Sequence, residues 1–259
     1  MGGLVSAPSG SDRRSDRGDP EIAIDRAIDE VLRPWKELLE PVVVLFSGGL
    51  DSGLLAWELR GFTRLRLVTV GAPHSPDLGT AHEAARMLRL RWTGREVSPT
   101  EVERLARELE RELVDLSAVD RSVQVAMAVA LAEGPAGPLL CGQGTDELFG
   151  GYAHYRGLSP EEAARRSAAD LEKLLNHDWP RTIQVAARLG RSVTAPYLDP
   201  RFVSAALALP PEVRLASDPP KAWFRSFARR RGLPEALVTR PKRAFQYSSG
   251  VDRILRRSG

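Results

Sequence analysis

An apolar stretch that ends in a glycine-rich turn is the feature that most restricts the fold of this chain. Residues 42–61 read VVVLFSGGLDSGLLAWELRG, so the apolar run 42–46 passes through a short turn into a helical pattern. A strand that is apolar on both sides is typical of a parallel sheet covered by helices on both faces. The stretch therefore predicts a strand at 42–46 and a helix at 53–60 of an α/β protein.

The same alternation of strands and helices continues to about residue 152. Further strands are predicted at 64–71, 91–97 and within GPLLCG (137–142). The helices predicted between and before them cover 20–39, 79–90, 99–114 and 119–133. We therefore expect an α/β fold built on a doubly wound parallel sheet.

Strand signals nearly vanish after about residue 152. Amphipathic helices are predicted at 160–190, 199–208 and 221–231, and Pro-Pro pairs interrupt the chain between the last two. This half is expected to form a helical layer beside the sheet.

The domain organisation follows from the same pattern. Residues 1–19, which are rich in Gly, Ser, Arg and Asp, are expected to be a disordered tail. Residues 20–259 are expected to form one domain, with an α/β core at about 40–152 and a helical part at about 153–259.

Composition excludes several classes of protein. A chain of 259 residues with 42% hydrophobic residues can bury a full core. The net charge is only +3 and the basic residues are spread along the chain, which argues against a nucleic-acid partner. Cys141 is the only cysteine, so a disulfide framework and a Cys-x-x-Cys site are excluded. No apolar run approaches the roughly 20 residues of a membrane span, and we expect a cytoplasmic protein without a membrane partner.

The first glycine-rich turn has the residues of a phosphate site. It consists of Ser47, Gly48, Gly49, Leu50, Asp51 and Ser52. Ligands of open α/β sheets bind where strands lead into helix N-termini, and backbone amides with two hydroxyls suit a pyrophosphate. A carboxylate at Asp51 would repel phosphate unless a cation lies between them, which points to Mg²⁺. The alternative is an ordinary strand-to-helix turn with an aspartate cap.

A second glycine-rich turn follows the strand of GPLLCG. Gly142 and Gly144 precede Asp146 and Glu147, which stand where the next helix is expected to start. Glu147 fits a residue that favours the helix dipole. Asp146 is expected at the same edge of the sheet as Asp51, where the two carboxylates could share a magnesium-pyrophosphate.

Both turns resemble motifs of one enzyme family. SGGLDS resembles the pyrophosphate loop of N-type ATP pyrophosphatases, and GQGTDELFGGY resembles the second signature of asparagine synthetases and β-lactam synthetases. The segments 68–77, 194–215 and 221–246 are similar to further asparagine synthetase segments in the same order. The similarity covers about residues 25–257. The chain thus resembles the C-terminal synthetase domain of asparagine synthetases, as a stand-alone form without the glutaminase domain.

The resemblance implies an adenine nucleotide alpha hydrolase-like fold, with ATP and Mg²⁺ as cofactors. ATP would adenylate a carboxylate, with aspartate as the first candidate, and a nitrogen nucleophile would then displace AMP to give an amide. The backbone of Val70 and Gly71 would read adenine, and Gly142 and Gly144 would also contact the nucleotide. Lys242 would neutralise charge on the α-phosphate.

Neighbouring residues receive less specific roles. Only four lysines occur in the chain, so a lysine within a motif is informative, and this favours a functional Lys242. Lys221 and Arg225 are assigned to helix packing or a surface face, and Arg240 could assist a phosphate. Tyr152 and Tyr155 are expected to be packing residues with hydrogen-bonded hydroxyls.

Two departures separate this sequence from glutamine-dependent asparagine synthetases. The chain begins Met-Gly-Gly and lacks the N-terminal nucleophilic cysteine, so ammonia is expected from solution or from a separate glutaminase subunit, unless another amine is used. Gln143 stands where the family motif has a glutamate near the reacting carboxylate and amine. Gln143 forms hydrogen bonds but cannot take a proton, which leaves the acceptor open.

Three alternatives to an aspartate ligase remain. One is a ligase for another small carboxylic acid, and one is a nucleotide-binding partner or regulatory subunit without turnover. The third is a tRNA-modifying pyrophosphatase, and the missing catalytic cysteine pair and the absence of an added basic domain argue against it. Retention of Asp51, Asp146 and Lys242 favours turnover over a dead subunit. A homo-oligomer is compatible with the sequence.

Overall fold

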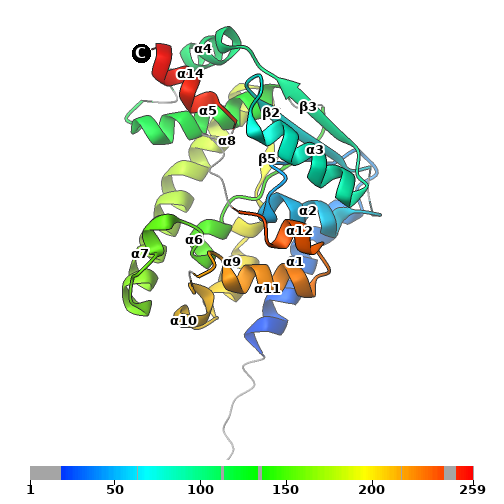
Figure 1. Ribbon diagram of the computed structural model, residues 1–259, viewed down its shortest axis with the longest axis vertical. Coiled ribbons are helices and arrows are strands. Elements are labelled where there is room, and N and C mark those ends of the chain that lie inside the picture. Colours follow the sequence, from blue (N-terminus) through cyan, green and yellow to red (C-terminus); the bar gives the residue numbers. More distant parts are fainter. Residues whose placement is uncertain are drawn as a thin grey trace, which may run out of the picture.

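Five parallel strands form the central sheet of the computed structural model, which describes residues 19–62, 64–111, 114–133, 136–216, 218–241 and 249–258. The strands are β1 (Val43–Leu45), β2 (Arg66–Gly71), β3 (Trp92–Glu96), β4 (Leu139–Leu140) and β5 (Val193–Thr194). Their order is β3-β2-β1-β4-β5, and every pairing is parallel. Figure 1 shows the fold, with β2, β3 and β5 labelled. The winding direction reverses between β1 and β4, which is where open α/β sheets bind ligands.

Helices connect the strands as the sequence predicted. The first half contains α1 (Pro20–Lys36), α2 (Leu50–Leu59), α3 (Pro76–Leu88), α4 (Pro99–Glu108) and α5 (Ala118–Glu133). Local signals set several starts: Asp19 caps α1, and Ser98 forms a capping box with Glu101 at the start of α4.

The second half is mostly helical. Its longer helices are α7 (Pro160–Lys173), α8 (Trp179–Arg188), α9 (Pro200–Leu207), α11 (Ala222–Arg230) and α14 (Val251–Ser258). The shorter pieces are α6 (Thr145–Phe149), α10 (Pro211–Arg214), α12 (Glu235–Val238), the 3₁₀ turns η1 (Ala153–Tyr155) and η3 (Pro196–Leu198), and the π-helical turn η2 (Leu174–Asp178). The strand β5 was not predicted, because two residues between helical patterns carry no periodicity.

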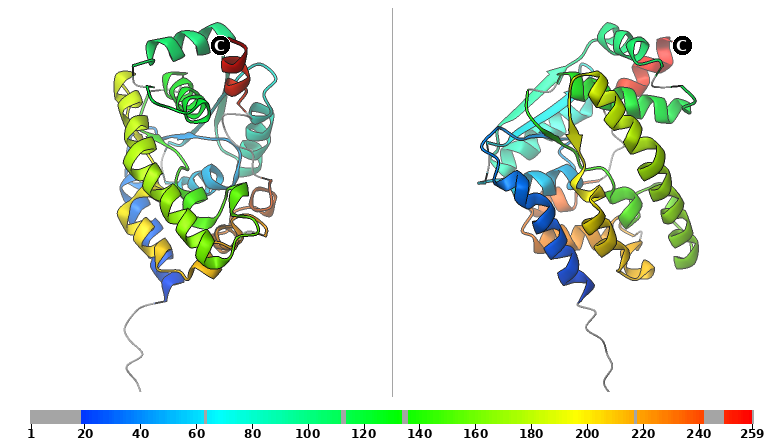
Figure 2. Two further views of the ribbon diagram at one scale, coloured as in Figure 1. Left: turned by 90° about the vertical axis from the view of Figure 1, so that its left-hand side faces the viewer. Right: turned by 180° about the vertical axis from the view of Figure 1, so that it is seen from behind.

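Helices cover the sheet on both faces. Alternate residues of β1 face opposite ways: Val44 joins the cluster of apolar side chains from α1, α2, α9 and α11, whereas Val43 joins the cluster from α4, α5, α8 and α14. Figure 2 shows the two sets of helices on either side of the strands. The doubly wound parallel sheet with a C-terminal helical layer is therefore confirmed.

The domain boundaries proposed from the sequence stay predictions, and residues 1–18 of the expected tail lie outside the described residues. Within the part of the chain that the structure describes, no helix is both long and apolar enough to cross a membrane.

Candidate active site

The two glycine-rich turns meet at the carboxyl edge of the sheet. The turn 47–49 leads from β1 into α2, and the turn 141–144 leads from the neighbouring strand β4 into α6. A Cβ atom on Gly142 would lie 3.0 Å from Asp51 Cβ and 3.0 Å from the backbone nitrogen of Ser52. Glycine at 142 therefore permits the close approach of the two turns, and its predicted contact with the nucleotide stays a prediction.

The first turn is held by its own serines. The backbone N–H of Ser47 donates to Ser52 Oγ (3.2 Å), and the N–H of Gly49 donates to Ser47 Oγ (3.3 Å). Gly48 has a φ of +73°, and a Cβ there would lie 2.8 Å from Ala81 Cα, so a larger residue is excluded.

The start of α2 can bind an anion. Gly49 precedes the helix and no side chain of the described residues caps it, so the first amides of α2 suit an anionic ligand. Leu50, by contrast, is buried in the core and contributes only its backbone to this turn.

Lys221 joins the two predicted metal-binding carboxylates. Its Nζ lies 2.7 Å from Asp51 Oδ1 and 2.8 Å from Asp146 Oδ1. It also donates to Thr145 Oγ1 at 2.8 Å. Asp51 and Asp146 are therefore brought together, as predicted, by a residue that the sequence analysis had assigned to packing or to a surface face.

The charge on Lys221 is retained despite its burial. Burial alone would lower the pKa of the ammonium group, but the carboxylates of Asp146 and Asp51 more than offset this and raise the pKa above its ordinary value. The side chain is only 3% exposed. Its rarity in this sequence and its place at the start of a family-like segment were signals that could have identified it.

Gly151 leaves the space that Lys221 and Asp146 occupy. A Cβ on Gly151 would lie 1.8 Å from Asp146 Oδ1 and 2.4 Å from Lys221 Cε. The N–H of Gly151 also donates to the carbonyl oxygen of Asp146 at 2.9 Å. The fourth glycine of the second signature is thus a steric requirement of the ion cluster.

Two arginines brace the backbone around the site. Arg225 Nε donates to the carbonyl of Pro220 at 2.8 Å, and its guanidinium also donates to the carbonyls of Val238 and Arg240. Arg240 Nη1 donates to the carbonyls of Gly48 and Thr80, both at 2.9 Å. Arg240 thus binds the backbone of the first turn, and its suggested contact with phosphate stays a prediction.

The predicted adenine site lies at the end of β2. Val70 is buried, and a Cβ on Gly71 would lie 2.2 Å from Ser75 Oγ, so the chain passes close to itself there.

Gln143 is half-buried between Gly142 and Gly144. Lys242 lies outside the described residues, and its role stays a prediction.

A glutamate beside the ion cluster is held by a tyrosine. Tyr152 donates its hydroxyl hydrogen to Glu147 Oε1 at 2.5 Å, and Tyr155 donates to Asp170 Oδ2 at 2.8 Å, so both are packing residues with hydrogen-bonded hydroxyls, as predicted. Burial and the neighbouring charge of Asp146 raise the pKa of Glu147 to about 7.

The donor set fits Mg²⁺ that arrives with phosphate. Asp51 and Asp146 supply carboxylate oxygens at the same place, and the described residues contain no cluster of three or more Asp, Glu, His or Cys side chains that could hold a metal. Mg²⁺ commonly uses one or two carboxylates and takes its other ligands from phosphates and water. The remaining ligands would therefore come from the nucleotide.

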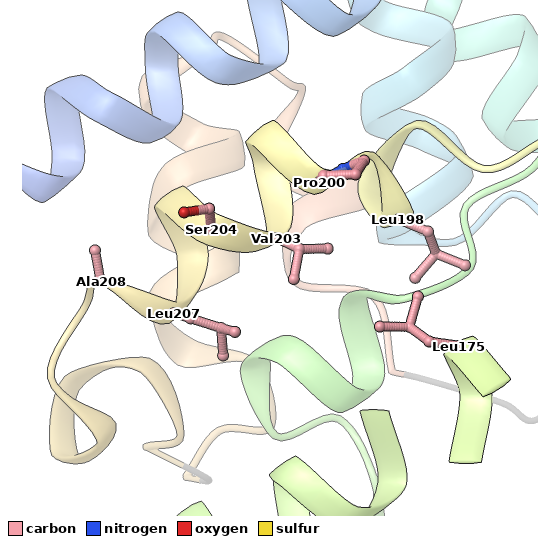
Figure 3. Close-up of a pocket in the computed structure, with 7 residues that line it drawn as sticks. All are labelled: Leu175, Leu198, Pro200, Val203, Ser204, Leu207 and Ala208. Carbon is pink, nitrogen blue, oxygen red and sulfur yellow. The ribbon is translucent and has the colours of Figure 1, made fainter. Parts of the chain in front are cut away.

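A separate apolar hollow lies beside α9 (Figure 3). It has a volume of about 520 Å³ and is lined by Leu175, Leu198, Pro200, Val203, Ser204, Leu207 and Ala208. Leu198 also separates it from the second turn, since a Cβ on Gly144 would lie 2.4 Å from Leu198 Cδ2. The hollow has no charged lining residue and is not the site of the predicted chemistry.

A family model described as asparagine synthase matches residues 38–194 and 159–258. The chain belongs to the asparagine synthase family. A putative glutamine-hydrolyzing asparagine synthetase from Methanocaldococcus jannaschii is 27% identical, over 90% of this chain and 50% of that protein. The Gallus gallus asparagine synthetase is 28% identical over 94% and 45%, and the Rattus norvegicus protein is 30% identical over 81% and 40%. The chain thus spans about half the length of these asparagine synthetases.

Solved structures of other proteins are also similar in part. The NMN synthetase of Francisella tularensis aligns over 92% of this chain and 86% of its own, with a TM-score of 0.47 and 12% identity. A predicted tRNA methyltransferase subunit from Methanocaldococcus jannaschii aligns over 64% of this chain and 73% of its own, with a TM-score of 0.35 and 20% identity.

Proposed function

We propose that this member of the asparagine synthase family is an AMP-forming amide ligase. It would use ATP to adenylate a carboxylate, release pyrophosphate, and transfer the acyl group to ammonia or another amine. The observation that carries this proposal is the meeting of Asp51 and Asp146, from two separate glycine-rich turns, at one edge of the sheet. Such a pair suits a magnesium-pyrophosphate leaving group.

The residues of the site divide the work of the first step. The amides at the start of α2 and the hydroxyls of Ser47 and Ser52 would hold the phosphates. Asp51 and Asp146 would hold Mg²⁺, which would neutralise the negative charge that develops on pyrophosphate. Lys242 would act on the α-phosphate, and the backbone of Val70 and Gly71 would bind adenine.

Aspartate is the acceptor that the family favours, and another small carboxylic acid is the alternative. The relatives are named glutamine-hydrolyzing, and the two sources of ammonia that we propose are a separate glutaminase subunit and free ammonia. The alternative that is not an enzyme is a nucleotide-binding partner subunit without turnover.

ATP-pyrophosphate exchange separates these possibilities. We expect radiolabelled pyrophosphate to enter ATP only when Mg²⁺ and one of a panel of carboxylic acids, aspartate included, are present. Asp51→Ala and Lys242→Ala should each lower exchange to background, whereas wild-type exchange in either variant would reject its assigned role. If no acid promotes exchange, or if ADP and phosphate are formed, the proposed reaction is wrong.

A further inference from the structure

The ammonium group of Lys221 occupies the place where the two carboxylates would hold a metal cation. Its Nζ contacts Asp51 Oδ1 and Asp146 Oδ1 at 2.7 and 2.8 Å, with little access to water. These are side chains that the proposed function assigns to Mg²⁺. An ammonium group and a divalent cation cannot occupy this position together, because they would overlap and their positive charges would repel.

The fold holds Lys221 at this position. Its φ of +60° is in the left-handed region, which is unfavourable for a residue other than glycine. Arg225 binds the chain on both sides of this residue, through the carbonyl of Pro220 and through its own N–H to the carbonyl of Lys221 (2.8 Å). Gly151 supplies the space for the aliphatic part of the side chain. An unfavourable backbone conformation that is stabilised on several sides is typical of a functional position.

We propose that Lys221 is an internal counter-ion that closes the metal site until a polyphosphate arrives, so that the divalent cation binds only together with the phosphates. The identity of that polyphosphate rests on the proposed function. Two carboxylates alone give the site a charge of −2, and Lys221 reduces it to −1, which weakens its attraction for a free cation. A polyphosphate brings further oxygen ligands for the cation and new acceptors for the ammonium group, so both charges can be satisfied.

Binding of Mn²⁺ without nucleotide tests this role directly. Electron paramagnetic resonance of free Mn²⁺ should show at least about tenfold tighter binding to Lys221→Met than to the wild type, because the two carboxylates lose their counter-ion. Lys36→Met is the matched control, since Lys36 also lies near two carboxylates, Asp29 and Glu58, but away from the site. It should bind Mn²⁺ as the wild type does. Equal affinity in Lys221→Met and the wild type would overturn the proposal.

A measurement on the wild type covers the case in which Lys221→Met does not fold. MgCl2 alone should leave its thermal midpoint unchanged, whereas MgCl2 with pyrophosphate should raise it. An equal rise with MgCl2 alone would overturn the counter-ion role. The two proposals can be told apart. If Lys221→Met binds Mn²⁺ tightly but the wild type shows no ATP-pyrophosphate exchange, the counter-ion role is supported and the proposed ligase is not.

Discussion

Gly151 shows how little space surrounds the ion cluster. Its φ lies outside the left-handed region, so Gly151→Ala tests space alone. The new methyl group would overlap Asp146 Oδ1 and Lys221 Cε. We expect a loss of about 1 to 3 kcal/mol in the free energy of unfolding and at least about a tenfold loss of exchange activity. Urea denaturation and the exchange assay measure the two effects.

Gly79→Ala is the matched control for that substitution. Gly79 lies within α3, and a Cβ there would meet no atom within 4 Å. Alanine should stabilise the helix slightly and leave exchange unchanged. A similar loss in both variants would show that the close contacts at Gly151 are not the cause.

Gln143 offers a test of the second chemical step. Gln143→Glu restores a carboxylate that can accept a proton from ammonium. We expect amide formation with ammonium chloride to rise several-fold relative to exchange, which does not use the amine. Product analysis by mass spectrometry measures the ratio. An unchanged ratio would show that residue 143 does not take part in proton removal.

The thiol of Cys141 is expected to be unreactive toward thiol reagents in the folded protein. Burial raises the pKa of its thiol to about 12, and the side chain is 3% exposed. Because the thiolate is the reactive form, labelling by a disulfide reagent at pH 8 should be at least about 100-fold slower than in concentrated urea. Fast labelling of the native protein would contradict the burial of this residue.

Residues differ in how far their roles can be inferred from sequence. The pairing of Asp51 with Asp146 was predictable, since both follow parallel strands that end at one edge. The position of Lys221 between the two carboxylates was not, although its rarity and its family-like segment marked the residue, because nothing local shows that the chain after Pro219 and Pro220 turns inward. Its environment is created by residues far away in the sequence.

At the scale of elements, one arginine joins three helices behind the site. Arg231, at the end of α11, binds Glu58 of α2 through Nε and Nη2 at 2.7 and 2.8 Å, and Asp29 of α1 through Nη2 at 2.6 Å. Glu58 is 8% exposed. The helices α2 and α11, which start next to Asp51 and Lys221, are thus also fixed at their far ends.

Removal of that arginine should destabilise the protein. Arg231→Met leaves the buried carboxylate of Glu58 without its bidentate partner, and we expect a loss of about 2 to 4 kcal/mol in the free energy of unfolding, measured with urea. Arg229→Met on the same helix removes a surface pair with Glu235 and should cost less than about 1 kcal/mol. Equal losses of unfolding free energy in the two variants would show that burial does not make the Arg231 contacts more stabilising than a surface pair.

Element boundaries show the same division between local and distant information. The start of α4 follows from its Ser98 capping box and proline, which are local signals. The strand β5 depends on pairing with β4, as Leu139 with Val193 and Leu140 with Thr194. Two residues cannot reveal such a pairing in a sequence pattern.

At the scale of the whole molecule, the sheet order explains why the two glycine-rich turns lie together. Strands that alternate with helices indicated the fold class, with the buried apolar β1 as the clearest signal, and the glycine-rich turns marked the edge that we propose as the active site. The positions of β1 and β4 as neighbours then brought the two turns together. The path of the C-terminal segments over that edge depends on side-chain packing between helices. The periodicity of apolar residues in the sequence does not predict such packing.

The pairing of β1 with β4 has a consequence for how this protein folds as it is synthesised. Val43 pairs with Leu139, so the first turn leaves the ribosome long before the strand that completes its surroundings, and Lys221 follows later still. Contacts of such long sequence separation form slowly. A nascent chain would therefore carry only part of the proposed phosphate site, which would be complete only after the final strand order has been reached.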